Sequence, residues 1–285
     1  MFRAPQPTVR RSSRRALLLP VLLVTVFAAP PAVAQQIETL EVREYEACMQ
    51  LVNIEPDRAF ERALQMQDSG FGAPARHCAA AALAAGGHHE EAAKRFEALA
   101  ADMPDSAPAS IVANILGHAG ISWLAAGKPG QAYSVQTAAL DLAPRSADIL
   151  VDRAMTLDEL DRLWEAVDDL DAALEIDPGR VDAHVLRASA YRQLDVLDLA
   201  MESVNRALKL EPDDPEGLLE RGIIHRLNGD LDAARADWIK VIELHDGRPA
   251  AEMARRNLDR LDFGPPEEDG TQDGQAGENQ ADPAE

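Results

Sequence analysis

The chain has 285 residues, of which 46% are hydrophobic and 27% charged, an ordinary balance for a globular protein of one or two domains. Its net charge of −21 argues against a nucleic-acid binder, which needs a basic face, and against adhesion to anionic lipid headgroups. Two cysteines are too few for a disulfide-dense scaffold or a four-cysteine zinc site.

The first 34 residues have the three parts of a secretory signal peptide: a basic start, a short apolar centre and a small-residue end. No acidic residue precedes Glu38, residues 16–29 are almost wholly apolar, and residues 32–34 read Ala-Val-Ala. The apolar run, interrupted by Pro20, is shorter than the roughly 20 residues that span a bilayer. Cleavage after Ala34 is therefore favoured over a membrane anchor.

The export route and the destination follow from the same segment. Ser13-Arg14-Arg15 resembles a twin-arginine signal, whereas the strongly apolar stretch after it favours the ordinary Sec route. Nearly all basic residues are arginines, a bias that we expect of a GC-rich bacterium. The predicted location is the periplasm or the extracellular space, with no membrane span once the signal peptide is removed.

Residues 35–72 are predicted to form a divergent N-terminal helix pair with a break at Glu55-Pro56, because proline does not continue a helix. Cys48 and Cys78 fall in the first helices of adjacent helix pairs. In an exported protein two cysteines most simply pair, and closing such a loop contributes about 3–4 kcal/mol in the chain-entropy description. A disulfide is favoured over two buried free thiols.

A 34-residue period organises residues 73–248. Its anchor is an alanine column with spacings of 40, 34, 34 and 34, at Ala92, Ala132, Ala166, Ala200 and Ala234. Twelve positions before each anchor lies a small residue: Ala80, Gly120, Ala154, Ala188 and Gly222. Five positions before it lies a turn-former: Gly87, Gly127, Asp161, Asp195 and Gly229. Twelve positions after the first four anchors lie Pro104, Pro144, Pro178 and Pro212.

Each unit reads as two antiparallel helices. The turn-former separates them, the proline ends the unit, and the small residue allows the two helices to approach closely. One such pair cannot cover its own apolar face, so neighbouring pairs must stack. The pattern therefore predicts an all-α solenoid of five stacked helix pairs.

The units resemble tetratricopeptide repeats (TPR), over about residues 73 to 246. The resemblance rests on two motif sets: Gly120, Trp123, Ala132 and Pro144, and then Ala188, Tyr191, Ala200 and Pro212. Six extra residues around 102–108 separate the first repeat from the second, and His225 stands where the family prefers tyrosine. The resemblance implies a TPR-like α-solenoid, and the signal peptide predicted above makes this an exported bacterial TPR protein.

The C-terminal part divides into two segments. Residues 249–263 are predicted to form a lone capping helix with Pro249 in its first turn. Residues 264–285 contain seven acidic and no basic residues and are predicted to be a disordered acidic tail.

No pattern in the sequence carries recognisable chemistry. His88-His89-Glu90-Glu91 is expected to be a solvated turn, because adjacent helical residues do not share a face. Asp168-Asp169-x-Asp171 is expected to be the solvated side of a helix, and Trp164 and Trp238 are expected to pack in the core or between repeats. We therefore expect no catalytic residue, no metal site and no cofactor.

Function must then reside in a surface. Stacked repeats present the first helix of each pair along a groove suited to an extended peptide or a partner helix. The repeat register assigns the following residues to this groove: Asp152, Met155, Val185, Ser189, Arg192, Leu219, Ile223 and Arg226.

The chemistry of this groove limits its partner. Some members of the resembled family hold a peptide carboxylate with lysines and asparagines at the starts of these helices. The matching positions here are Asp148, Asp182 and Glu216, which would repel a carboxylate. The expected partner is another protein or peptide with an apolar or basic segment.

The sequence thus predicts a non-enzymatic, protein-binding scaffold or adaptor of the bacterial envelope. One alternative is a permanent accessory subunit of an envelope enzyme or a secretion complex. Another is a metal-dependent hydrolase with its site in the divergent N-terminal pair, which would involve His77, His88 or His89.

Overall fold

The computed structural model describes the backbone of residues 31–264 and the side chains of residues 40–264. Most of the predicted signal peptide and the tail from residue 265 onward lie outside this part. The helices described below belong, from Arg43 onward, to the compact unit Arg43–Glu285. The described part contains thirteen α-helices and no strand: α1 Pro31–Val52, α2 Pro56–Asp68, α3 Ala73–Ala85, α4 His89–Ala101, α5 Ala109–Ala125, α6 Pro129–Leu142, α7 Ala147–Glu159, α8 Leu163–Ile176, α9 Val181–Gln193, α10 Leu197–Leu210, α11 Pro215–Leu227, α12 Leu231–Leu244 and α13 Pro249–Phe263.

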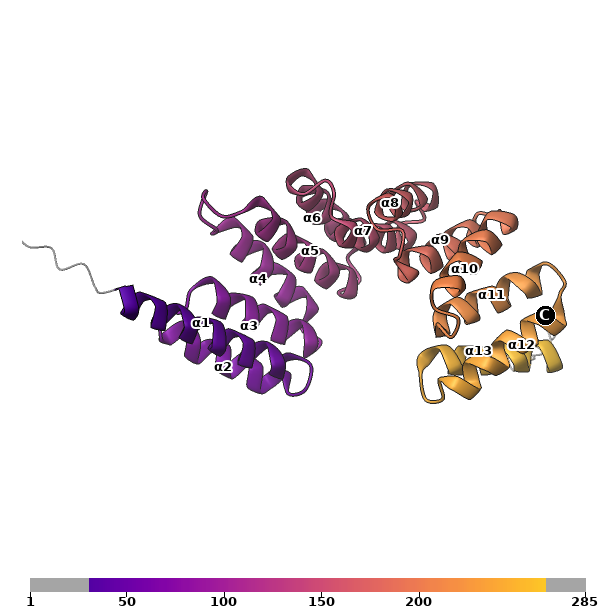
Figure 1. Cartoon of the computed structure of the whole chain (residues 1–285), viewed down its shortest axis with the longest axis horizontal. Coiled ribbons are helices and arrows are strands. Elements are labelled where there is room, and N and C mark those ends of the chain that lie inside the picture. Colours follow the sequence, from indigo (N-terminus) through magenta and orange to yellow (C-terminus); the bar gives the residue numbers. More distant parts are fainter. Residues whose placement is uncertain (1–30, 265–285) are drawn as a thin grey trace, which may run out of the picture. The chain divides into compact units, whose positions relative to one another are not determined.

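The helices pack in chain order as stacked antiparallel pairs. From α2 to α13 each helix contacts the next one, and the colours of Figure 1 follow this succession. The first helices of successive pairs also contact each other, since α7 touches α5 and α9, and α11 touches α9 and α13. This arrangement confirms the predicted all-α, TPR-like array. Among the described helices, none is both long enough and apolar enough to cross a membrane.

The five turns that join the two helices of a pair share one backbone conformation. All five members of the turn column have positive φ, including the non-glycine residues Asp161 at 56° and Asp195 at 60°. The amide of the residue after each turn donates to the carbonyl five positions earlier, as Asp230 does to His225 at 2.9 Å. This is the Schellman motif at the C-terminal end of a helix. The residue with positive φ turns the chain so that the following amide can donate a hydrogen bond to one of the last carbonyls of the helix. His225 performs this role with its backbone, so the departure from tyrosine leaves the turn intact.

The close approach of the two helices in a pair is visible at the glycines of the small-residue column. A Cβ on Gly120 would lie 2.5 Å from Cγ of Gln136, and one on Gly222 would lie 2.3 Å from Nε1 of Trp238. Each facing residue is sixteen positions later in the chain. In the other repeats these two positions hold alanine and a medium or large apolar residue: Ala80 and Phe96, Ala154 and Leu170, Ala188 and Val204.

Buried ion pairs add a second link between the helices of a pair. Arg153 binds both carboxylate oxygens of Asp169 at 2.7 Å, and Arg221 binds both of Asp237 at 2.6–2.7 Å. Both aspartates are only 7% exposed. The expectation that Asp169 lies on a solvated helix side is therefore wrong, because an arginine sixteen residues earlier covers it. Such bidentate pairs fix geometry as well as adding energy.

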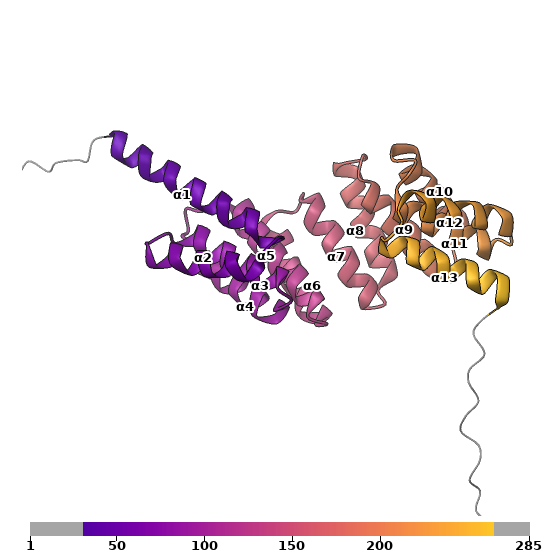
Figure 2. The same cartoon turned by 90° about the horizontal axis from the view of Figure 1, so that it is seen from below.

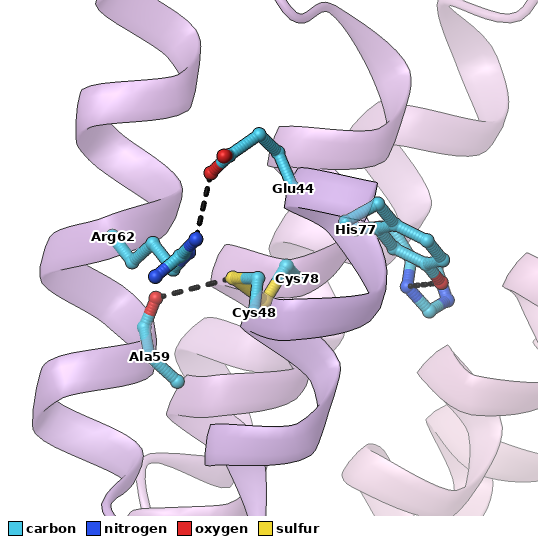
Figure 3. Close-up of a disulfide and its surroundings, with 7 residues drawn as sticks. Glu44, Cys48, Ala59, Arg62, His77 and Cys78 are labelled. Carbon is cyan, nitrogen blue, oxygen red and sulfur yellow. Dashed lines mark hydrogen bonds and ion pairs between the residues drawn. A yellow bond between two sulfur atoms is a disulfide. The ribbon is translucent and has the colours of Figure 1, made fainter. Parts of the chain in front are cut away.

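At the N-terminal end of the Arg43–Glu285 unit, a disulfide joins the first two helix pairs. Cys48 of α1 and Cys78 of α3 are bonded and fully buried (Figure 3). Beside them, Arg62 of α2 binds Glu44 of α1 at 2.7 Å. A covalent bond therefore holds α1 and α3 together where the sequence departs furthest from the repeat pattern.

At the C-terminal end, α13 closes the array as a capping helix. It contacts both α11 and α12, which Figure 2 shows beside it. Ala250, Ala251 and Ala254 are buried in this contact, and Asp262 pairs with Arg235 of α12. The opposite side of α13 is exposed and polar, as a terminal helix requires for solubility.

We predict that Gly222→Ala lowers the free energy of unfolding by about 1–3 kcal/mol, because the new methyl group overlaps the Trp238 ring. In a Trp238→Leu background the same change should cost much less, since Ala and Leu already occupy this pair in the third repeat. Urea denaturation of the unmodified chain, the two single variants and the double variant gives the coupling energy between positions 222 and 238. The control is Gly130→Ala in α6, where a Cβ meets open space; equal costs at 130 and 222 would contradict the overlap.

We predict that Gln136→Met raises the free energy of unfolding by about 1–2 kcal/mol. Gln136 is fully buried, and neither its amide oxygen nor its amide nitrogen has a hydrogen-bond partner. Methionine keeps the shape and removes the unsatisfied amide. Gln131→Met on the exposed side of α6 is the matched control and should change stability by less than about 0.5 kcal/mol. A loss of stability in Gln136→Met would show that the buried amide is satisfied.

Candidate functional site

The first helices form a continuous face that carries cavities. We call the face formed by the first helices α3, α5, α7, α9 and α11 the inner face; the residues assigned to the predicted groove lie on α7, α9 and α11. Two of its cavities adjoin each other around α7 and α9, and both are lined by Met155 and Leu186. The larger encloses about 550 Å³ and the smaller about 120 Å³.

The larger cavity, here called the acidic cavity, combines an apolar lining with carboxylates. It lies between α7, α9 and the start of α11. Its apolar lining consists of Met155, Val181, Val185 and Leu186. Its carboxylates are Asp182, Glu211, Asp214 and Glu216. No lysine or arginine is among its lining residues, and of its carboxylates only Asp182 has an ion-pair partner in the described part of the chain, Arg180.

Asp152 of α7 lies half-buried beside this group of charges. Burial, followed by the neighbouring Asp148, raises the pKa of Asp152 to about 6, while Arg180 acts in the opposite direction. Arg180 itself pairs with Asp148 and Asp182. Asp152 thus forms no ion pair within the described part of the chain. A half-buried carboxylate without a paired cation costs stability, and such a cost is typical of a binding position.

The inner face also contains polar contacts that hold neighbouring repeats together. Arg192 of α9 donates to Glu220 of α11 at 2.5 Å and to Ser189 at 3.0 Å. Gln193 of α9 donates to Asp158 of α7 at 2.6 Å. The polar groups of Arg192 and Ser189 are therefore already paired: Arg192 links α9 to α11, and Ser189 supports it from within α9.

The predicted groove residues accordingly separate into groups. Met155, which is 43% exposed, and Val185 line the acidic cavity, and Ser189 lines the smaller cavity. Leu219 and Ile223 are half-buried against the C-terminal core, and Arg226 is exposed. Asp182 and Glu216 also belong to the acidic cavity. A basic group from a partner would meet these carboxylates next to the apolar lining.

Trp164 lies at a contact between two repeats, one of the two places expected for it, and not in the core. It is 59% exposed at the start of α8 and makes an edge contact with Tyr191, with 6.4 Å between ring centroids. Trp238 is fully buried, as predicted. The two tryptophans differ because Trp238 faces a glycine of its partner helix, whereas Trp164 lies in the first turn of α8, next to the turn between the helices.

The described residues offer no group of three or more His, Cys, Asp or Glu side chains arranged to hold a metal ion. His88 and His89 lie at the start of α4, where Glu90 pairs with Lys94 and Lys128, each at 2.8 Å. These two cations lower the pKa of Glu90 to about 2. The charges of this segment are used in surface ion pairs.

Comparisons with known proteins agree with this architecture. The family model for the tetratricopeptide repeat matches residues 185–252. The chain is similar to the crystal structure of TTC0263, a thermophilic TPR protein of Thermus thermophilus: the TM-score is 0.55 with 21% identity over 67% of this chain and 99% of that one. It is also similar to the crystal structure of MamA: the TM-score is 0.50 with 18% identity over 57% of this chain and 92% of that one. No curated protein sequence matches.

At such identities the structural likenesses establish the fold alone. They define an all-α array of the tetratricopeptide class, which agrees with the packing of the thirteen described helices. The sequence signature of the tetratricopeptide repeat itself is matched over residues 185–252, in α9 to α13.

We predict that Asp152→Asn raises the free energy of unfolding at pH 7.5 by about 1–3 kcal/mol, because the carboxylate is more costly to ionise in the folded chain. Because folding raises the pKa of Asp152, its protonated form contributes to the stability of the folded chain. This contribution is fully present below the unfolded pKa of about 3.9 and is lost as the pH rises to about 6. The gain from asparagine should therefore vanish near pH 4. Urea denaturation at both pH values measures it.

Glu202→Gln on the exposed side of α10 is the matched control and should have little effect at either pH. A gain in Asp152→Asn that is the same at pH 4 and pH 7.5 would show that its cause is not the ionised carboxylate.

Proposed function

We propose that this protein is a non-enzymatic adaptor that binds a segment of a partner protein on its inner face. The observation that carries the proposal is the acidic cavity, where apolar side chains of α7 and α9 lie beside Glu211, Asp214 and Glu216, carboxylates that form no ion pair within the described part of the chain. The partner segment is expected to combine apolar residues with lysine or arginine.

The geometry favours a basic residue for a physical reason. The aliphatic stem of a lysine or arginine can lie against Met155 and Val185 while its charged end reaches Asp182 or Glu216. An acidic segment would meet only like charges. The same cation would favour the ionised form of Asp152, so binding is expected to strengthen as the pH rises through about 6.

Export to the bacterial envelope is part of this proposal. The N-terminal sequence supports it through the basic start, the short apolar centre and the Ala-Val-Ala of residues 32–34. The disulfide between Cys48 and Cys78 also supports it, since disulfides persist mainly in oxidising compartments.

The test uses a short fluorescein-labelled peptide that alternates leucine and arginine, and a second peptide with glutamate in place of arginine. Fluorescence anisotropy with the chain from residue 35 onward, at physiological salt, should show that the arginine peptide binds about tenfold or more tightly than the glutamate peptide. Combining Met155→Ala, Leu219→Ala and Ile223→Ala should weaken the arginine peptide by about tenfold. The exposed pair Glu211→Gln and Glu216→Gln should weaken it without affecting the core.

A matched control removes exposed apolar side chains from the second helices α10 and α12: Leu199→Ala, Leu231→Ala and Ile239→Ala. This control should bind like the unmodified chain. If it loses as much affinity as the inner-face variants, or if those variants bind normally, the peptide does not use the inner face.

A further inference from the structure

A second cavity of different chemistry lies at the N-terminal end of the inner face. It encloses about 460 Å³ between α1, α3 and α5 and is closed by the end of α4. We call it the aromatic cavity. Its lining residues are Tyr45, Ala73, Pro74, His77, Leu99, Met103, Ile111, Asn114, Ile115 and His118. None of them is a carboxylate, a lysine or an arginine.

The cavity lies at the junction where the repeat period is broken. The six extra residues are shared between a long connection, 102–108, and a longer first helix, since α5 has 17 residues and α7 has 13. Unlike the later first helices, α3 and α5 do not pack closely on each other. Met103 and Ile111 come from this extended region and line the space between the two helices.

Aromatic rings from four helices meet beside this space. The ring of His77 lies 5.8 Å from Tyr45, 5.4 Å from Phe96 and 5.4 Å from His118, measured between centroids, and each pair is edge-on. The hydroxyl of Tyr45 and Nδ1 of His77 are hydrogen-bonded at 3.0 Å, which fixes both rings; Figure 3 shows His77 beside the disulfide. His118 remains accessible from the cavity.

The cavity is electrically neutral near pH 7. Burial lowers the pKa of His77 to about 4, with a further contribution from His118, and burial also lowers the pKa of His118. Burial raises the pKa of Tyr45, so its hydroxyl keeps its proton. Arg76 and Asp102, the chain neighbours of the lining residues His77 and Met103, pair with each other at 2.9 Å. In a chain of net charge −21, this is a site for an uncharged group.

We propose that the aromatic cavity binds one aromatic side chain of the partner segment; the proposal rests on the peptide-binding function proposed above. The cavity volume lies within the range of small-ligand sites, and its rings can surround another ring edge-on. Such contacts strengthen binding beyond the burial of area, and an aliphatic side chain does not obtain this gain. The amide of Asn114 offers a hydrogen bond to a tyrosine hydroxyl.

The aromatic cavity and the acidic cavity would then bind different residues of one partner segment. His118 also lines a cavity of about 310 Å³ between α3 and α5, and Leu124 of α5 lines the small cavity that adjoins the acidic one. Cavities therefore follow the first helices from α1 to α11. A segment along this face would place its aromatic residue at α3 and α5 and its basic residue at α9 and α11.

The test uses single-residue probes, so that it does not depend on the acidic cavity. N-acetyl amides of tyrosine, phenylalanine, leucine and lysine are titrated into the chain from residue 35 onward, and the imidazole resonances of His77 and His118 are followed by NMR. The tyrosine and phenylalanine probes should shift both resonances in a saturable way and bind about fivefold more tightly than the leucine and lysine probes. Binding of all four probes with equal affinity would overturn the proposal.

A variant that fills the cavity completes the test. Asn114→Phe places a ring of the chain itself in the cavity and should abolish the shifts caused by the tyrosine probe, while Asn205→Phe on the exposed side of α10 should leave them unchanged. Persistent shifts in Asn114→Phe would overturn the proposal. So would saturable binding of Zn²⁺ alone to His77 and His118, because the imidazoles would then belong to a metal site. Failure of these probes leaves the peptide test at the acidic cavity unaffected.

Discussion

The structure depends on how closely the two helices of each pair approach. Where the first helix carries glycine, the second carries Gln136 or Trp238 so close that a Cβ would overlap it, and where the first carries alanine, the facing position holds leucine, valine or phenylalanine. This matching of volumes sets the spacing inside each pair. The spacing in turn determines which side chains of the first helices remain accessible. The inner face therefore depends on how the first helices pack against the second helices.

On this constant framework the inner face varies in chemistry. The N-terminal junction, widened by six extra residues, leaves an uncharged space surrounded by rings. The region around α9 leaves a space of similar size that is lined by carboxylates. Arg192, Gln193 and Arg180 connect neighbouring repeats between and around these spaces. The repeats therefore provide uniform backbone geometry, and the individual side chains provide selectivity.

The sequence predicted the architecture well because the responsible interactions recur at fixed spacing. Small residues, turn residues and prolines repeat every 34 positions, and each has a local backbone or packing cause. Two kinds of interaction escaped prediction. The pair of Arg153 and Asp169 had a recurring signal that was not used: Arg153, Arg187 and Arg221 are 34 positions apart, and each contacts the polar residue sixteen positions later, Asp169, Ser203 or Asp237. His77 and His118 meet only because their helices are neighbours across the irregular junction, where the repeat register is lost.

The covalent bond between α1 and α3 makes the two ends of the array unequal. In a linear stack each helix pair is held only by its neighbours, so opening begins by fraying at an end. Cys48–Cys78 ties down the N-terminal end, while α13 is held at the other end by non-covalent contacts alone. Local opening therefore starts from the C-terminal end, and backbone amides of α12 and α13 exchange with solvent sooner than those around the sulfur bridge.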